Sequence, residues 1–166
     1  MSAIDLLLAG NETFAGSFDR GYVPPPPELG LVVITCMDAR IDVYAALGLE
    51  LAQAHVLRNA GGVVTDDTIR SLAISQRLLG TREVAVIHHT DCGMLNVDEA
   101  DFKDAVERET GIRPEWSLEA FADLDGDVRE SLARIEASPF VPHRDAVRGF
   151  VYDVATGRLR EVSPVA

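Results

Sequence analysis

Hydrophobic residues along the chain alternate between short continuous runs and runs with helical spacing. The continuous runs are rich in β-branched residues, which is typical of strands buried on both faces of a parallel sheet. The run at 31–35 has this character, and two further strands are predicted at 54–58 and 83–88. Helical spacing predicts a short helix over 42–47 and a longer one ending at residue 79, with Asp66 or Asp67 as the N-cap of the longer helix. This strand–helix–strand rhythm indicates an α/β protein.

The N-terminal segment, residues 1–28, precedes this alternating region. Apolar residues at helical spacing predict an amphipathic helix over about 2–18, and Ser2 is in the position of its N-cap. The run of prolines at 24–27 is incompatible with a helix interior or a central strand. It predicts an extended connector that leads into the first strand.

The C-terminal half begins with an acidic, helix-prone segment. Residues 96–137 predict a helical excursion, broken near 111–114 and again at Gly126, that covers the core without forming part of it. Residues 148–154 and 158–162 then flank a short glycine-containing turn. They predict a hairpin that adds an antiparallel edge strand to the parallel sheet.

Together the elements predict one α/β domain over residues 1–166, with a mostly parallel sheet flanked by helices. The predicted strand order is 2-1-3-4, followed by the antiparallel edge strand. A chain of 166 residues has the usual size of a single domain.

Net charge restricts the partners of this domain. With 15 Lys and Arg residues against 27 Asp and Glu residues, the chain carries a formal charge of −12. This charge repels phosphate backbones and anionic lipid, so we expect a small-molecule ligand and neither nucleic acid nor membrane as a partner. The sequence shows no apolar run near the roughly 20 residues of a membrane span and no pattern of a secretory signal. We therefore expect a cytoplasmic location.

Polar and metal-ligating residues directly follow two of the predicted strands. Cys36, Asp38 and Arg40 follow the first strand, and their alternate spacing places them on one face if the chain stays extended. His89 and Cys92 follow the third strand, at a spacing that lets one tight turn present both to a metal ion. In the predicted strand order these two strands are neighbours and flank the switch point where ligands bind in open α/β sheets. We therefore expect the two groups to meet.

Two cysteinates and one imidazole form a three-ligand set for zinc, and catalytic zinc sites combine three protein ligands with one open position. Sulfur ligands disfavour Mg²⁺ and Ca²⁺. Asp38 can either fill the fourth position or stand back and hydrogen-bond the group that fills it. If the guanidinium fork of Arg40 holds both oxygens of Asp38, the position stays open to water.

Each of these residues also has an ordinary role when taken alone. Cys36 and Cys92 could fill the core as small hydrophobic residues, or form a disulfide in an oxidising sample. His89 could be an ordinary hydrogen-bonded histidine, and Asp38 with Arg40 could be a surface ion pair that contributes little stability. Convergence of all five residues at the switch point favours a metal site.

Three motifs of the sequence resemble those of the β-class carbonic anhydrases. They are Cys-Met-Asp-Ala-Arg at 36–40, Arg-Asn-Ala-Gly-Gly at 58–62 and His-His-Thr-Asp-Cys-Gly at 88–93. The resemblance extends from the first strand to the final hairpin, and the compact length is similar to that of the small prokaryotic and archaeal branch. It implies a zinc ion held by Cys36, His89 and Cys92, with Asp38 and Arg40 as a catalytic pair.

The resemblance also implies a reaction and an assembly. The reaction is the reversible hydration of carbon dioxide to bicarbonate and a proton by zinc-bound hydroxide, and the assembly is a homodimer or homotetramer. Relatives of this fold that hydrolyse carbonyl sulfide or carbon disulfide use the same zinc set, so these substrates are an alternative. A second alternative is a non-enzymatic binding module in which Asp38 permanently closes a structural zinc site.

Overall fold

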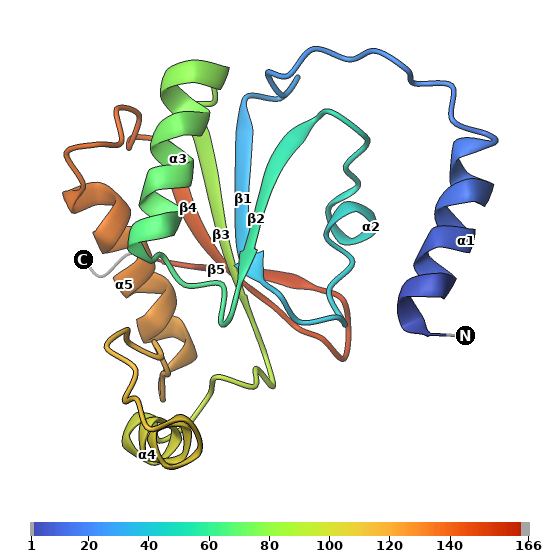
Figure 1. Cartoon of the computed structure of the whole chain (residues 1–166). Helices are drawn as coiled ribbons and strands as arrows, with labels where there is room; N and C mark the ends of the chain where they lie inside the picture. Colours follow the sequence, from blue (N-terminus) through green and yellow to red (C-terminus); the bar gives the residue numbers. More distant parts are fainter. Residues whose placement is uncertain (1, 164–166) are drawn as a thin grey trace.

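The computed structural model describes residues 2–163 and contains a five-stranded sheet in the order β2-β1-β3-β4-β5 (Figure 1). Strands β1 to β4 are mutually parallel, and β5 runs antiparallel to β4. In chain order the elements are α1 (Ala3–Ala15), β1 (Leu31–Cys36), α2 (Val43–Leu47), β2 (Ala54–Asn59), α3 (Asp66–Leu79), β3 (Glu83–His89), α4 (Glu99–Thr110), α5 (Leu124–Ala137), β4 (Val147–Tyr152) and β5 (Leu159–Val162). The predicted α/β class, strand order and antiparallel edge strand are confirmed. The predicted domain also includes residues 1 and 164–166, which lie outside the described residues.

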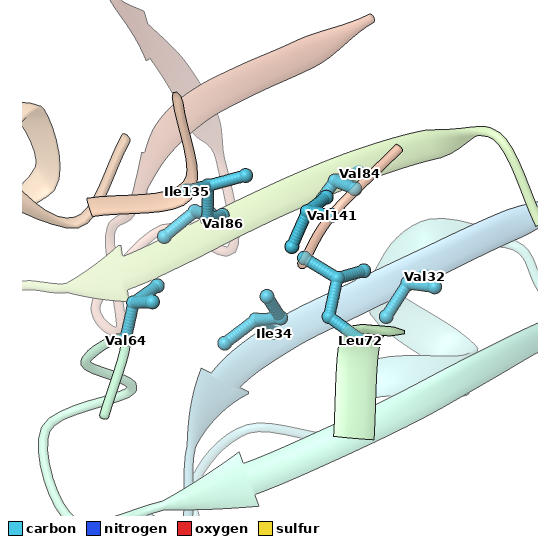
Figure 2. Packing of buried hydrophobic residues seen from close by; sticks show 8 residues of the cluster. All are labelled: Val32, Ile34, Val64, Leu72, Val84, Val86, Ile135 and Val141. Carbon is cyan, nitrogen blue, oxygen red and sulfur yellow. The ribbon is translucent and has the colours of Figure 1, made fainter. Parts of the chain in front are cut away.

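Strand β1 is buried on both faces, as its continuous apolar sequence predicts. Helices α3 and α5 cover one side of the sheet, and α2 lies on the other (Figure 1). Figure 2 shows the core on the first side, where Val32 and Ile34 of β1 meet Leu72 of α3 and Ile135 of α5. Val33 points to the opposite side and packs in a second cluster with residues around α2. The core therefore holds β1 as an interior strand of the sheet and fixes the position of its C-terminal end.

Helix α5 corrects two predictions about the acidic segment. The predicted break at Gly126 is wrong, because the Asp123 side chain accepts a hydrogen bond from the Asp125 backbone and starts α5 before the glycine. The helix is also part of the core and not only a cover, since Val128 and Ile135 are fully buried. In α3, similarly, the N-cap is Thr65 instead of one of the two aspartates that follow it.

The chain leaves the sheet after the third strand and returns to almost the same point. Leu95 and Phe121 form an isolated parallel bridge, and the Asn96 N–H donates to the Phe121 carbonyl at 2.7 Å. Helix α4 and the segment that follows it therefore form a loop whose two ends are held together. The predicted interruption at 111–114 is confirmed, because α4 ends at a left-handed Gly111.

Helix α1 forms where the sequence predicts it but does not pack on the sheet. Ser2 caps it through a capping box with Asp5, and the helix ends at Ala15, about three residues earlier than predicted. None of the side chains of this described helix is buried, and Ile4, Leu7 and Phe14 remain 59% to 71% exposed. Figure 1 shows α1 apart from the sheet, at the end of a long connecting segment.

Among residues 2–163, no helix has both the length and the apolar character that spanning a membrane would require.

Candidate metal centre

The carboxyl ends of β1 and β3 bring three metal-ligating side chains together. Cys36 is the last residue of β1, His89 is the last residue of β3, and Cys92 lies in the turn that follows. Their potential ligand atoms all lie within 4.8 Å of one another, and all three residues are buried. Both cysteines are free thiols, so the disulfide alternative is not observed. The switch-point argument thus correctly placed the two halves of the cluster at one edge of the sheet.

The loop after β2 shapes the backbone around Cys36. Gly62 has a φ of +76°, and a Cβ atom at this position would lie 2.7 Å from the Cys36 backbone nitrogen. Arg58, near the end of β2, donates from Nε to the Cys36 carbonyl at 2.9 Å and from Nη2 to the Asp38 carbonyl at 2.7 Å. These contacts hold the segment from Cys36 to Asp38 in place at the end of β1.

Sequence reasoning noted the motif at 58–62 that contains both residues but assigned neither of them a role at the site. The glycine-bearing turn has the composition of an ordinary loop, and Arg58 resembles any exposed residue at a strand end. One signal was available, because parallel pairing of β1 with β2 in register sets Arg58 opposite Thr35 and Asn59 opposite Cys36. A long guanidinium side chain at that register can reach the carbonyl groups that β1 leaves free where it ends.

His89 presents one defined nitrogen to the cluster. Its Nδ1 lies 2.9 Å from the Thr90 carbonyl oxygen, which can only accept, so Nδ1 carries a proton and donates it. In the neutral ring Nε2 is then the unprotonated nitrogen, the form that binds metal ions. Nε2 is buried and has no hydrogen-bond partner among the described residues. A buried acceptor without a partner is costly, and a metal ion would satisfy it.

Asp38 lies beside the cluster and is held by Arg40. One carboxylate oxygen, Oδ1, accepts from the Arg40 backbone N–H at 2.9 Å and from Nε at 3.0 Å. The other oxygen, Oδ2, accepts from Nη2 at 2.7 Å and lies 3.8 Å from His89 Nε2. The chain does not stay extended as far as Arg40, because the Ile41 N–H donates to the Asp38 carbonyl and closes a turn. This turn brings Arg40 back onto the carboxylate.

Proximity within the cluster changes the acidity of its members. The Cys92 thiol lowers the pKa of Cys36 well below its usual range, against the opposing effect of burial, and His89 lowers it further. The same contact with Cys36, together with burial, raises the pKa of Cys92. Burial lowers the pKa of His89, but the neighbouring Cys36 more than offsets this, so that the pKa is raised overall.

Hydrogen bonds from Arg40 lower the pKa of Asp38 well below its usual range. Asp38 is therefore a carboxylate at neutral pH and can accept a hydrogen bond but cannot donate one.

The donor set of the cluster fits a soft or borderline transition metal. Two sulfur atoms and one imidazole nitrogen are typical ligands of zinc, whereas Mg²⁺ and Ca²⁺ require oxygen ligands. Asp38 is the nearby oxygen donor, and its two carboxylate oxygens are already occupied by Arg40. The three residues Cys36, His89 and Cys92 would hold the metal, and this arrangement leaves the fourth position to another ligand.

The fold and the cluster define an α/β protein with a Cys-His-Cys group that could hold a metal ion at the carboxyl edge of its sheet. A family model described as "Carbonic anhydrase" matches residues 31–159, from the start of β1 to the start of β5. The chain is 57% identical over 164 residues to "Beta-carbonic anhydrase 1" of Mycobacterium tuberculosis, an alignment that covers 99% of this chain and 100% of that protein. The chain belongs to the β-carbonic anhydrase family.

Two further relatives define the range of similarity. The crystal structure of carbonic anhydrase from Streptococcus mutans matches with a TM-score of 0.92 and 41% identity, over 98% of this chain and 99% of that one. A carbon disulfide hydrolase from Saccharolobus solfataricus is 34% identical over 161 residues, which cover 82% of this chain and 78% of that protein.

The contact between Gly62 and β1 predicts that Gly62→Ala destabilises the protein and weakens metal binding. The added Cβ conflicts with backbone atoms of residues 35 and 36, so we expect a loss of about 3 kcal/mol in the free energy of unfolding. Gly80→Ala is the matched control, because Gly80 has a similar φ of +74° but open space around its Cβ position. The control should lose only about 1 kcal/mol. Chemical denaturation and bound-metal analysis measure both effects, and equal losses for the two variants would contradict the prediction.

Proposed function

We propose that this protein is a zinc-dependent enzyme that reversibly hydrates carbon dioxide to bicarbonate and a proton. The observation that carries the proposal is the buried Cys36–His89–Cys92 cluster, with the Asp38 carboxylate at 3.8 Å from the imidazole nitrogen that faces it. Membership of the β-carbonic anhydrase family and the names of the two carbonic anhydrases among the relatives support the same reaction. The substrate is small, in agreement with a net charge of −12 that disfavours polyanionic partners.

Zinc is the metal that best suits this cluster. When bound, it would lower the pKa of a coordinated water toward 7 and so supply the nucleophile for carbon dioxide. Cys36 and Cys92 would both bind as thiolates, and their two negative charges cancel the formal charge of Zn²⁺. We therefore expect the nucleophile to form at higher pH than in a site built from three neutral histidines.

Asp38 and Arg40 would prepare the nucleophile for attack. Because the pKa of Asp38 is low, its carboxylate could accept a hydrogen bond from the nucleophile and so direct an oxygen lone pair of that nucleophile at the carbon of carbon dioxide. Formation of the C–O bond would give bicarbonate, and the proton lost from water would pass to the solvent. Arg40 holds both oxygens of Asp38, which keeps the carboxylate from taking the fourth position on the metal.

This reaction predicts carbon dioxide hydration that requires zinc and increases with pH. Stopped-flow assays of the zinc-loaded protein from about pH 6.5 to 9 should show a rising rate. Cys92→Ala is the control, because it removes one ligand and should abolish zinc-dependent activity. Absence of hydration at every pH, with zinc bound in a 1:1 ratio, would contradict the proposal. Carbonyl sulfide and carbon disulfide should then be tested as substrates.

The proposed role of Asp38 predicts that replacing it with the neutral isostere asparagine strongly reduces activity. Asp38→Asn should reduce kcat/KM about a hundredfold while zinc stays bound, because an amide that donates to the nucleophile cannot orient it in the same way. Asp67→Asn is the matched control, since Asp67 forms an exposed ion pair with Arg70 on α3. Full activity of Asp38→Asn at normal zinc content would exclude this role.

We further propose that residues 1–166 form one domain that acts in the cytoplasm as a homodimer or homotetramer. Residues 1–28 would serve as an arm that packs on a second copy. Helix α1 supports this arrangement because its apolar side chains, including Ile4, Leu7 and Phe14, are exposed on a well-capped helix at the end of an extended connector. Contiguous exposed apolar surface of this kind marks an interface.

The proposed arm predicts that charges on α1 reduce the assembly. The double variant Leu7→Glu/Phe14→Glu should shift the mass measured by analytical ultracentrifugation toward that of a monomer. Asn11→Glu is the matched control, because it adds a charge to the same exposed helix without removing apolar surface. An unchanged mass for the double variant would show that α1 does not hold the subunits together.

A further inference from the structure

Arg40 binds a second acidic residue besides Asp38. Its Nη1 donates to the Asp91 carboxylate oxygen Oδ2 at 2.6 Å, and its Nη2 donates to the Asp91 backbone carbonyl at 2.7 Å. Asp91 lies between the two cluster residues His89 and Cys92, whereas Asp38 follows Cys36. The guanidinium of Arg40 therefore connects the two segments that supply the cluster.

The backbone of Asp91 makes this double contact possible. Its φ is +54°, in the left-handed region that Asp and Asn adopt more readily than most other residues. In this conformation the carbonyl and the carboxylate of one residue both reach the same guanidinium. The turn that carries Cys92 toward the cluster thus also presents two acceptors to Arg40.

The two contacts occupy different edges of the guanidinium plane. Nε and Nη2 bind the carboxylate of Asp38, and Nη1 and Nη2 bind Asp91. A guanidinium that is hydrogen-bonded on one edge can still rotate together with its partner. A guanidinium that is hydrogen-bonded on two edges is held in a fixed plane. The position of Asp38 beside His89 therefore depends on what Arg40 binds on its far edge.

The contact between Arg40 and Asp91 is too exposed to contribute much to overall stability. The side chain of Asp91 is 79% exposed and that of Arg40 is 46% exposed. Exposed ion pairs contribute little to the free energy of unfolding, so a merely stabilising role would be small. The Asp38 side chain is only 17% exposed. The exposed Asp91 therefore restricts, through Arg40, the orientation of a carboxylate that is itself mostly buried.

We propose that Asp91 is a positioning residue, which acts through Arg40 to orient the Asp38 carboxylate over the metal cluster. This inference rests on the proposed function of Asp38 and Arg40. Asp91 does not touch the reacting atoms. Its carboxylate fixes the plane of the guanidinium, and the guanidinium in turn fixes the direction of the two Asp38 oxygens.

Asp91→Asn is the informative variant. Asparagine tolerates a positive φ and keeps the backbone carbonyl contact, but its neutral amide loses the strong ionic hydrogen bond to Nη1. In the zinc-loaded protein, kcat/KM for carbon dioxide hydration should fall about tenfold, with unchanged zinc content and melting temperature. Asp67→Asn, which removes the same charge from the exposed pair with Arg70, should retain full activity.

Repeating the Asp91→Asn substitution in an Arg40→Lys protein separates a positioning role of Asp91 from a general effect of its charge. Lysine at position 40 keeps the positive charge but lacks the planar fork that joins Asp38 to Asp91. In an Arg40→Lys protein, Asp91→Asn should therefore change kcat/KM by less than about twofold, since the two effects pass through one side chain. A further tenfold loss in that background would mean that Asp91 acts by its charge alone and would overturn the proposal.

A measurement independent of activity completes the test. In the ¹H–¹⁵N NMR spectrum of the zinc-loaded protein, the Nε–H of Arg40 should give a resolved signal protected from exchange by Asp38, identified by its loss in Arg40→Lys. The signal should broaden or disappear in Asp91→Asn and persist in Asp67→Asn. An unchanged signal in Asp91→Asn would contradict the proposal. This readout remains valid if the native protein fails to hydrate carbon dioxide, so the two proposals can fail separately.

Discussion

The parallel pairing of β1 with β3 is the constraint on which the rest of the site depends. The two strands lie side by side in a register that aligns Leu31 with Glu83 and Thr35 with Ile87. Because their directions agree, both end at the same edge of the sheet, where Cys36 and His89 become neighbours although more than fifty positions separate them in the sequence. Burial of β1 on both faces makes any other register costly, since apolar side chains would lose their places in the core.

The cluster places polar atoms in a region where the fold supplies few partners. His89 donates from one ring nitrogen to the Thr90 carbonyl, and its other ring nitrogen has no hydrogen-bond partner among residues 2–163. The two cysteines change each other's pKa. Such a group would be unfavourable as plain core packing. The surrounding contacts from Arg58, Gly62 and Arg40 are made to the backbone, to Asp38 and to Asp91, so they leave the ligand atoms themselves free. The local structure is therefore organised for a ligand that the chain itself does not provide.

The fold and the members of the cluster were predictable because each has a local signal. Apolar runs predict the strands, and ligand-type residues at the strand ends predict the site. The supports were not predictable in the same way, because Arg58 and Gly62 act on backbone atoms whose positions follow only from the pairing of β1 and β2. Helix α5 was wrongly predicted to cover the core without forming part of it. Its acidic sequence suggested a solvent-exposed helix, although Val128 and Ile135 are fully buried.

The bridge between Leu95 and Phe121 separates the site from the segment that follows it. Since the chain leaves and re-enters the domain at one point, the intervening residues behave as a closed loop, and a change in their number costs mainly loop-closure entropy, which grows slowly with length. Neither β3 nor α5 need shift when the loop becomes longer or shorter. This region of the molecule is therefore suited to carry insertions, a fused peptide or a reporter group, while the Cys36–His89–Cys92 cluster nearby keeps its geometry.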